Sequence, residues 1–425
     1  METRPILSTL RRHKLTATLL VLQVACTCAI VCNVAFMIAS RMHAVALPSG
    51  LAENQLSVIH SRFIGNDADP WTARHKADLY QADWAQHQVD LAALRAIPGV
   101  ESAVEVRFAL PLDMNNETFA TCPSQQALDQ AMQSMSIHGT GCVDVDVYDG
   151  SPGLIATLGL HLVAGRDFKP DEYVLARVQT PPVAIISSAL AQHLWPGQNA
   201  LGKELYVGKR IIRVVGIVGT LLAPNLHGAG RNYDTMIWPQ LAESTGVYYV
   251  MRSAPQDRAR ILRAAKATLL KLGPGRYINP KYVETYTQIR AKYFQRDTTM
   301  IGLLIASALG LLFVTALGIT GLASFWVQQR TRSIGIRRAL GATRAQILHY
   351  FQTENFLIVT AGVVLGVALA VGLNLLLMAH YELARLPLWY LPVGAIALWV
   401  LGQLAVLAPA LRASNVPPVV ATRSV

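Results

Sequence analysis

The chain has 425 residues, of which 52 % are hydrophobic and only 15 % are charged, whereas about 25 % of residues are charged in soluble domains. The mean hydropathy is +0.34, and the apolar residues are concentrated in four blocks. This composition excludes disordered chains, collagen-like repeats, coiled-coil rods and wholly soluble enzymes. The sequence therefore predicts a membrane protein with several spans and one large water-exposed part.

Each of the four apolar blocks is long enough to cross a bilayer. The blocks cover residues 15–40, 298–325, 355–379 and 386–411. A helix needs roughly 20 residues to cross a hydrocarbon core, and because lipid offers no partner for backbone N–H and C=O groups, each block is predicted to be helical. A cleavable signal peptide is the alternative for the first block, since residues 44–46 read Ala-Val-Ala. Arg41 and His43 intervene, which favours an uncleaved anchor.

The basic residues predict the orientation of the spans. Residues 1–14, 326–354 and 412–425 together hold eleven basic residues and two acids. By the positive-inside rule these three segments are expected to be cytoplasmic, and residues 41–297 to lie on the outer side. The cytoplasmic segments carry +9 of the formal charge of +11. The basic excess thus indicates orientation and contact with anionic lipid rather than nucleic-acid binding.

The outer segment is predicted to be a mixed α/β domain. Two strand–helix–strand units are expected within residues 56–110 and 248–285, with helices at 73–96 and 256–272. Between them, residues 113–232 are rich in Gly, Pro and turns and predict a β-rich insert. Its expected strands are residues 142–148, 183–186 and 211–218. The predicted fold class is membrane α-helical, with four transmembrane helices and a large extracytoplasmic α/β domain inserted between helices 1 and 2.

The five cysteines divide between the first apolar block and the outer segment. Cys26, Cys28 and Cys32 are expected to serve as small apolar packing residues. Cys122 and Cys142 are either a disulfide, in an oxidising compartment, or two free thiols.

Apparent catalytic and metal motifs fail in the detail of their residues. Residues 197–204 nearly match a phosphate-binding loop, but Glu204 stands where the motif needs Ser or Thr. Asp144 and Asp146 alternate with Val and are expected on one face of a half-exposed strand. They lack a third ligand for a metal, so a solvated face is the alternative. The sequence predicts no catalytic residue, no metal site and no cofactor bound by this chain.

Residues 328–355 predict two helices joined by a glycine bend. Ile334, Ile336 and Leu340 give a short amphipathic helix that ends at Gly341. Thr343-Arg-Ala-Gln is a capping box, which starts a second helix that continues into the third apolar block. A push on the short helix would be transmitted along the long one. The alternative is a helix held on the lipid surface by its arginines.

The loop sequence SIGIRRALGAT, residues 333–343, with Glu354 after it, resembles the signature E-I-G-(I/V)-R-(R/K)-A-(L/I)-G-A of the MacB/FtsX-like ABC permease family. Ser333 replaces the usual acid. In the outer segment, residues 151–168 resemble the family pattern S-P-x-(F/Y)…L-G…G-R-x-F. Residues 194–218 resemble L-F-P…(P/A)-L-G-K…V-V-G-V-V. The resemblance covers nearly the whole chain.

The resemblance implies a permease subunit of the bacterial inner membrane, of the separate-ATPase, mechanotransmission type. Its implied partners are a cytoplasmic ABC ATPase dimer, which binds ATP and Mg²⁺, and a second permease copy in a homodimer or heterodimer. A periplasmic adaptor and an outer-membrane channel are further candidates. The implied role is export of an antimicrobial peptide, an antibiotic or another envelope molecule. Lipoprotein release, and regulation of an envelope hydrolase or a peptide-sensing module, are the alternatives.

The resemblance also implies which residues couple to the ATPase. They are Arg332, Gly335, Arg337, Arg338, Gly341, Ala342 and Glu354, the last of which is expected at the membrane edge. In the third apolar block, Gly362 and Gly366 give a small-residue face on which another helix can pack closely.

Overall fold

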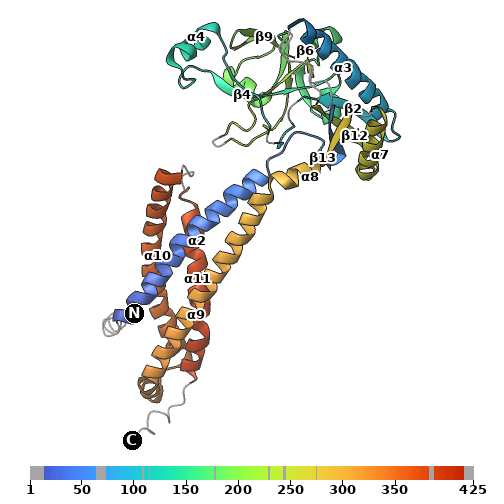
Figure 1. Ribbon diagram of the computed structural model, residues 1–425. Helices are drawn as coiled ribbons and strands as arrows, with labels where there is room; N and C mark the ends of the chain where they lie inside the picture. The colour runs from blue at the N-terminus through green and yellow to red at the C-terminus, as the bar shows by residue number, and fades with distance from the viewer. Residues whose placement is uncertain are drawn as a thin grey trace. The chain divides into compact units, whose positions relative to one another are not determined.

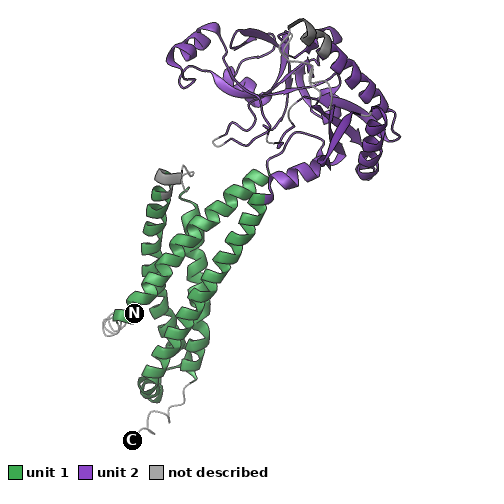
Figure 2. Ribbon diagram, viewed as in Figure 1, with its two compact units in different colours: residues 1–46, 296–425 green, residues 47–295 purple. Residues whose placement is uncertain are grey.

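The computed structural model describes residues 14–63, 73–107, 110–113, 115–176, 179–227, 230–242, 246–273, 275–381 and 387–415 (Figure 1). The chain divides into two compact units (Figure 2). Unit 1 comprises residues 1–46 and 296–425, and unit 2 comprises residues 47–295. Unit 2 is thus inserted in the sequence after the first long helix of unit 1.

Unit 1 contains four long apolar helices in its described part. They are α2 (Lys14–Val45), α9 (Gln295–Ala339), α10 (Arg344–Tyr381) and α11 (Tyr390–Ser414). All four are long and apolar enough to cross a membrane, as the sequence predicts. The expected separate amphipathic helix before Gly341 is wrong, because residues 328–339 are the last turns of the continuous 45-residue helix α9.

Helices α2 and α10 pack closely because two glycines of α10 leave room for α2. A Cβ atom added at Gly362 would lie 2.7 Å from the Cβ of Val24, and one added at Gly366 would lie 2.5 Å from the Cβ of Cys28. Both distances are shorter than van der Waals contact allows. The two glycines therefore form a seam, named here the glycine seam, along which α2 approaches the α10 backbone.

Helix α11 completes the tightly packed part of the bundle. A Cβ atom at Gly394 would lie 2.3 Å from the Sγ of Cys32, and one at Gly402 would lie 2.8 Å from Val359 of α10. Cys28 and Cys32 are buried in this core, as expected for packing residues, whereas Cys26 is exposed. Helices α2, α10 and α11 thus form a compact trio.

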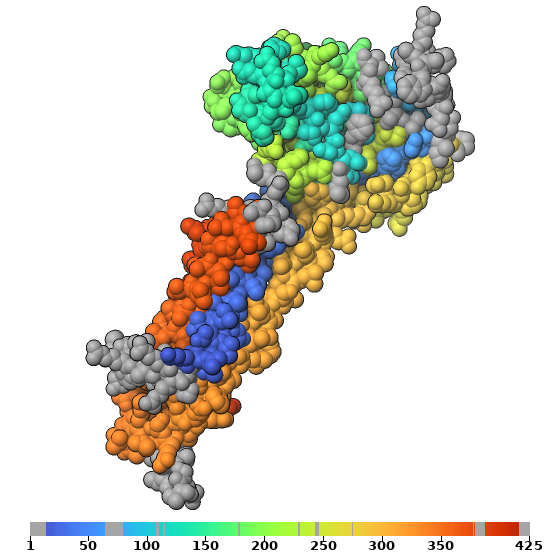
Figure 3. Space-filling model, turned by 60° about the vertical axis from the view of Figure 1, so that its left-hand side comes forward, coloured from blue at the N-terminus to red at the C-terminus, as the bar shows by residue number. Residues whose placement is uncertain are grey.

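Helix α9 is attached to this trio more loosely. In its most apolar 18-residue window 6 % is buried, against 44 % in α2, and on one face of the bundle α9 runs along α2 (Figure 3). A Cβ atom at Gly302, Gly310 or Gly321 would meet no described atom within 4 Å. Its attachments include polar contacts within the apolar region, such as Thr315 Oγ1 to Thr27 Oγ1 at 2.8 Å.

Unit 2 is built on a four-stranded antiparallel sheet. Its strands are β1 (Leu56–Phe63), β2 (Val100–Val106), β12 (Gly246–Ser253) and β13 (Arg276–Thr285), in the order β13-β1-β12-β2. Helix α3 (Ala73–Arg95) connects β1 to β2, and α7 (Arg258–Lys271) connects β12 to β13. Both predicted strand–helix–strand units are present. Their strands interleave in one sheet, which gives the ferredoxin-like β-α-β-β-α-β arrangement split by a long insert.

A buried ion pair ties α3 to this sheet. Arg276 of β13 and Asp90 of α3 both have fully buried side chains, and Arg276 Nη2 donates to Asp90 Oδ1 at 2.7 Å. The Tyr249 hydroxyl of β12 donates to Asp90 Oδ2 at 2.6 Å and lies 2.8 Å from His87 Nδ1. Each member of the network has a partner, which a buried charge requires.

The insert between β2 and β12 folds around a seven-stranded sheet. Its order is β3 (Thr118–Thr121), β4 (Val143–Asp149), β10 (Thr235–Trp238), β7 (Val183–Ser187), β9 (Arg210–Val218) and β5 (Leu162–Gly165), with β8 (Glu204–Val207) also paired to β9. The described part of the insert also contains α4 (Gln125–Ser134), α5 (Leu154–Leu158) and α6 (Ser188–Leu194), and α8 (Tyr286–Tyr293) follows β13 outside the insert. Strands β6 (Val174–Leu175) and β11 (Gln240–Leu241) pair with each other. A β-rich insert is thus present, but it runs past its predicted end at residue 232, because β10 belongs to the seven-stranded sheet and β11 pairs with β6.

The glycine seam predicts which α10 glycine tolerates a side chain. We expect Gly366→Val to lower the stability of the bundle by about 1–3 kcal/mol, the usual cost of overpacking, because the new side chain meets Cys28 and the α2 backbone. Gly372→Val is the matched control on the same helix, since a Cβ there meets no described atom within 4 Å. Thermal unfolding of the two variants in nanodiscs checks this. Equal unfolding midpoints would contradict the seam.

Candidate functional site

The bend between α9 and α10 is closed by a specific helix-end motif. The N–H of Ala342 donates to the carbonyl of Arg337 at 3.0 Å, and the N–H of Gly341 donates to that of Arg338 at 3.2 Å. Gly341 has φ +98°, a left-handed conformation that side-chain-bearing residues rarely adopt. These are the two bonds of a Schellman motif, which ends α9 and satisfies its last carbonyls.

The next helix begins directly after the bend. Gln346 N–H donates to Thr343 Oγ1 at 3.3 Å, and Thr343 N–H donates to Gln346 Oε1 at 2.9 Å. This reciprocal pair confirms the predicted capping box. Only a few residues therefore separate two long helices, and the direction of the chain reverses within them.

The residues implied to couple to an ATPase differ in exposure. Arg332, Arg337 and Gly341 are exposed, while Arg338 and Ala342 are half-buried. The guanidinium of Arg337 lies 5.3 Å from the centre of the Tyr350 ring, a cation–π distance. Gly335 is buried in the bundle, so it lies away from the surface that the bend offers.

Glu354, which is expected at the membrane edge, is buried between two helices. Its side chain is 2 % exposed and pairs with Arg330 of α9, with Nη1 to Oε2 at 2.8 Å and Nη2 to Oε1 at 3.2 Å. The reason is the contact of the two helices, which buries this position and supplies a guanidinium. The sequence places Arg330 only among the cytoplasmic basic residues. The pairing of Arg330 with Glu354 depends on the approach of α9 and α10, which no local sequence pattern predicts.

An apolar cluster packs the bend against α11. It joins Val327 and Ile334 of α9, Ile347 and Phe351 of α10, and two alanines of α11, Ala410 and Ala413. The cytoplasmic ends expected for three helices are thus fastened by side chains, and the exposed arginines project from a packed base.

A disulfide closes a lobe in the insert of unit 2. Cys122 and Cys142 are bonded across a sequence separation of 20 residues. The closed loop carries α4, whose buried face packs on the disulfide through Leu128 and Ala131. Met135 after α4 is 93 % exposed. The lobe therefore presents apolar side chains to solvent from a covalently closed base.

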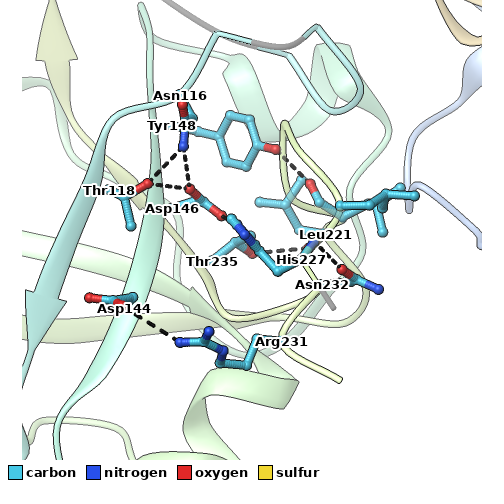
Figure 4. Close-up of polar contacts among 12 residues, drawn as sticks. Asn116, Thr118, Asp144, Asp146, Tyr148, Leu221, His227, Arg231, Asn232 and Thr235 are labelled. Carbon is cyan, nitrogen blue, oxygen red and sulfur yellow. Dashed lines mark hydrogen bonds and ion pairs between the residues drawn. The ribbon is translucent and has the colours of Figure 1, made fainter. Parts of the chain in front are cut away.

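Asp144 and Asp146 of β4 have different surroundings, contrary to the expectation of one solvated face. Asp146 is 1 % exposed because the segment at His227 covers it, whereas Asp144 on the same strand stays exposed. Its carboxylate accepts from Thr118 Oγ1 at 2.7 Å and lies 2.7 Å from His227 Nε2 (Figure 4). Asp144 is exposed and lies 3.6 Å from Arg231.

Several hydrogen bonds hold residues 221–227, in the segment before β10, against the sheet. The N–H of His227 donates to Asn232 Oδ1 at 2.7 Å, the Tyr148 hydroxyl donates to the carbonyl of Leu222 at 2.5 Å, and Thr235 Oγ1 donates to that of Leu221 at 3.0 Å (Figure 4). Protein groups thus satisfy the cluster. No group of three or more His, Cys, Asp or Glu side chains suited to a metal ion occurs in the part of the chain that the structure describes.

Asp113 is a partly buried acid near the four-stranded sheet. Burial, reinforced by the nearby carboxylate of Glu284, raises the pKa of Asp113 to about 7. Glu284 itself pairs with Lys292. Within the described residues, Asp113 Oδ2 has no hydrogen-bond partner. A backbone hydrogen bond at Leu110 lowers the pKa of Asp113 by less than burial raises it, so the cost of ionising this acid is only partly offset.

Comparison with known proteins identifies the family of the chain. The family model described as MacB-like periplasmic core domain matches residues 27–275, more than half of the chain, and the FtsX-like permease C-terminal model matches residues 305–418. The chain belongs to the MacB/FtsX-like permease family. It is accordingly a transmembrane permease subunit of the ABC transporter class, and its α/β domain is the periplasmic core domain of that family.

Curated relatives agree with this assignment. The chain is 24 % identical over 406 residues to a macrolide export ATP-binding/permease protein MacB of Pasteurella multocida, covering 92 % of this chain and 55 % of the relative. It is 28 % identical over 297 residues to MacB of Nitrosomonas europaea, covering 66 % and 43 %. The ABC transporter permease YknZ of Bacillus subtilis is 23 % identical over 282 residues, covering 66 % and 70 %. The chain thus spans about half the length of the MacB relatives.

Two solved structures are similar to part of the chain. The periplasmic region of MacB from Actinobacillus actinomycetemcomitans has 15 % identity and a TM-score of 0.32, covering 57 % of this chain and 94 % of that one. The extracellular domain of YknZ has 13 % identity and a TM-score of 0.31, covering 52 % and 99 %.

The raised pKa of Asp113 predicts a pH-dependent stability. Between about pH 4, the ordinary value for Asp, and about pH 7, the folded protein holds a proton that the unfolded chain has released. The free energy of unfolding contributed by this group therefore falls as the pH rises through that window and is constant above it. Asp113→Asn removes the ionisation. We expect the free energy of unfolding of the variant to be about 1–3 kcal/mol larger than that of the parent above pH 7, and the two values to be equal near pH 4.

Thermal unfolding of the full chain in nanodiscs across this pH range measures the difference. Asp144→Asn is the control, because Asp144 is exposed and its ion pair is worth little. A stability gain from Asp113→Asn that is the same at both pH values would contradict the assignment.

Proposed function

We propose that this permease couples ATP hydrolysis by a separate cytoplasmic ATPase to movement of its periplasmic domain. The bend between α9 and α10 carries the proposal. It presents Arg332, Arg337 and the backbone of Gly341 at an exposed end of two helices that continue into the membrane-spanning bundle. The proposed docking residues are Arg332, Arg337, Arg338, Gly341 and Ala342.

The charge pattern supports a cytoplasmic position for this bend. Under the positive-inside rule the arginines of residues 326–354 face the cytoplasm, where ATP is available. The same rule puts both termini in the cytoplasm. The chain then has one span, a periplasmic domain and three further spans.

The relatives support an ATPase as the partner. Proteins named macrolide export ATP-binding/permease MacB are about twice as long as the part this chain matches, and their names pair an ATP-binding activity with a permease. In our proposal a separate ABC ATPase dimer supplies ATP and Mg²⁺ binding. Two permease copies, identical or different, dock on it.

The proposed cargo is an antimicrobial peptide, an antibiotic or another envelope molecule. The apolar regions of the helices support movement of the periplasmic domain rather than an ion path, because residues 298–325, 355–379 and 386–411 contain no charged residue. A polar path through lipid needs such groups. To convert a 1:99 mixture of two states into 99:1, ATP binding must favour one state by about 5.5 kcal/mol.

Reversal of charge at the bend tests the proposal. We expect Arg337→Glu combined with Arg338→Glu to lower stimulation of the partner ATPase by about tenfold or more, within the usual range of coupling energies, because the docking surface then repels an acidic partner. ATP turnover by the complex reconstituted in nanodiscs is the measurement.

Arg412→Glu is the control, because Arg412 is an exposed arginine in the last turn of α11, outside the bend. Stimulation that persists at the parental rate in the folded double variant would count against the docking surface.

A further inference from the structure

The Arg330–Glu354 ion pair occupies a distinctive place between the bend and the bilayer. Arg330 lies eleven residues before Gly341 and Glu354 thirteen residues after it. At 1.5 Å per residue, the pair is about 16–20 Å from the bend along either helix. It therefore spans the two arms of the α9–α10 hairpin well above the surface proposed to contact the ATPase.

The Arg330–Glu354 pair has a fixed geometry, because it makes two hydrogen bonds and is largely buried. Nη1 of Arg330 donates to Oε2 of Glu354 and Nη2 donates to Oε1, and the exposed fractions of the two side chains are 17 % for Arg330 and 2 % for Glu354. A two-point contact fixes the orientation as well as the distance of the partners. Burial of Glu354 removes the water that would compete for its carboxylate, so separation of the two helices would leave a buried charge without its partner, which is strongly opposed.

The neighbouring residue extends the connection to α11. Asn355 Nδ2 donates to the carbonyl of Gly402 at 2.9 Å, and Asn355 is buried. A cavity of about 10 Å³ beside the pair is lined by Leu20 of α2, Trp326 of α9 and Val406 of α11, as well as by Glu354 and Asn355. The pair thus lies where all four helices of the bundle meet.

Helix α9 needs such a connection more than the other helices do. The trio of α2, α10 and α11 is held by close backbone approach at glycines, whereas three of the α9 glycines meet no described atom within 4 Å and a Cβ added at Gly318 would meet only the Gln23 side chain. The apolar cluster described above also joins α9 to α10, through side chains alone. A displacement that begins at the bend moves α9 and α10 by the same amount only if the two helices do not shift relative to each other. Side-chain contacts must supply that constraint.

We propose that the Arg330–Glu354 ion pair is a clamp that makes the α9–α10 hairpin move as one body, and that both residues are positioning residues for ATP coupling. The coupling part of this inference rests on the proposed function. Glu354 acts through Arg330 and α9 rather than by touching the ATPase, since its carboxylate is buried and already occupied.

The clamp itself is tested on the chain alone. Nitroxide labels at Gln329→Cys and His349→Cys, both exposed positions, report the distance between the arms in nanodiscs, in a background that lacks Cys26, Cys28 and Cys32. We expect a single narrow distance distribution for the parent and a broad one for Glu354→Gln and Arg330→Gln. The exchange Arg330→Glu with Glu354→Arg should restore the narrow distribution. A narrow distribution in both single variants would overturn the clamp.

The coupling role is tested on the complex with the ABC ATPase that co-purifies with the chain. We expect Glu354→Gln to retain ATPase binding but to lower stimulated ATP turnover by about five- to tenfold, and the charge exchange to restore it. Arg412→Gln, which removes an exposed charge outside the pair, should leave turnover unchanged.

The outcomes separate the two proposals. Loss of ATPase binding in Glu354→Gln, or failure of the folded exchange variant to recover turnover, would overturn the positioning role and indicate direct contact by an acid at position 354. Parental turnover in both single variants would overturn the coupling role while docking at the bend stands. Absence of any co-purifying ATPase would overturn the proposed function and the coupling role, and the distance measurement would still decide the clamp.

Discussion

The bend at Gly341 depends on one backbone conformation. With φ +98°, the chain can close both Schellman bonds and end a 45-residue helix within one residue. A side chain at this position would be strained, and α9 would then end less sharply or run on. Since the capping box at Thr343 starts α10 at once, the two helices are connected with little slack. In the proposed function, a force applied to the bend would therefore act on two rigid helices, α9 and α10.

The membrane bundle divides its helices between two kinds of packing. The glycine seam holds α2 against α10, and Gly394 and Gly402 bring α11 equally close to these two helices, which leaves the trio little freedom to slide. Helix α9 instead contacts the trio through side chains, namely polar pairs such as Thr315 with Thr27 and Arg330 with Glu354, and apolar side chains such as Val327 and Ile334. The proposed transmission of movement requires this combination, because a rigid frame must carry an element that can be displaced. Unit 2 begins and ends in sequence next to α2 and α9, so in the proposed function a movement of α9 would act on one of its two connections.

Much of this architecture could be predicted from the sequence. Lipid forces uncharged blocks to be helices, and β-branched runs bounded by Gly and Pro identify strands, so the four spans and both strand–helix–strand units follow from local patterns. The bend at Gly341 and the capping box at Thr343 could be predicted for the same reason, because helix ends are specified by residues only a few positions apart. The family motifs predict the class of protein, and the matches to the two family models confirm it.

What could not be predicted depends on contacts distant in sequence. Glu354 is the only acid in the residues 326–354, and nothing near it reports that α9 will bring Arg330 within 2.8 Å. The alternation of Val and Asp in β4 suggested a half-exposed strand, but the segment at His227 covers Asp146. The continuous helix through residues 328–339 was missed because its amphipathic pattern differs from that of the uniformly apolar span before it, although both belong to one helix.

The most direct test of the account is the side of the membrane on which the bend lies. Ala345→Cys puts a thiol on an exposed residue of the first turn of α10, and a membrane-impermeant maleimide applied to intact cells reports its accessibility from outside. The account predicts labelling only after the inner membrane is permeabilised. Labelling of this thiol in cells whose inner membrane is intact would contradict it, because a bend outside the cytoplasm cannot contact an ATP-hydrolysing partner there.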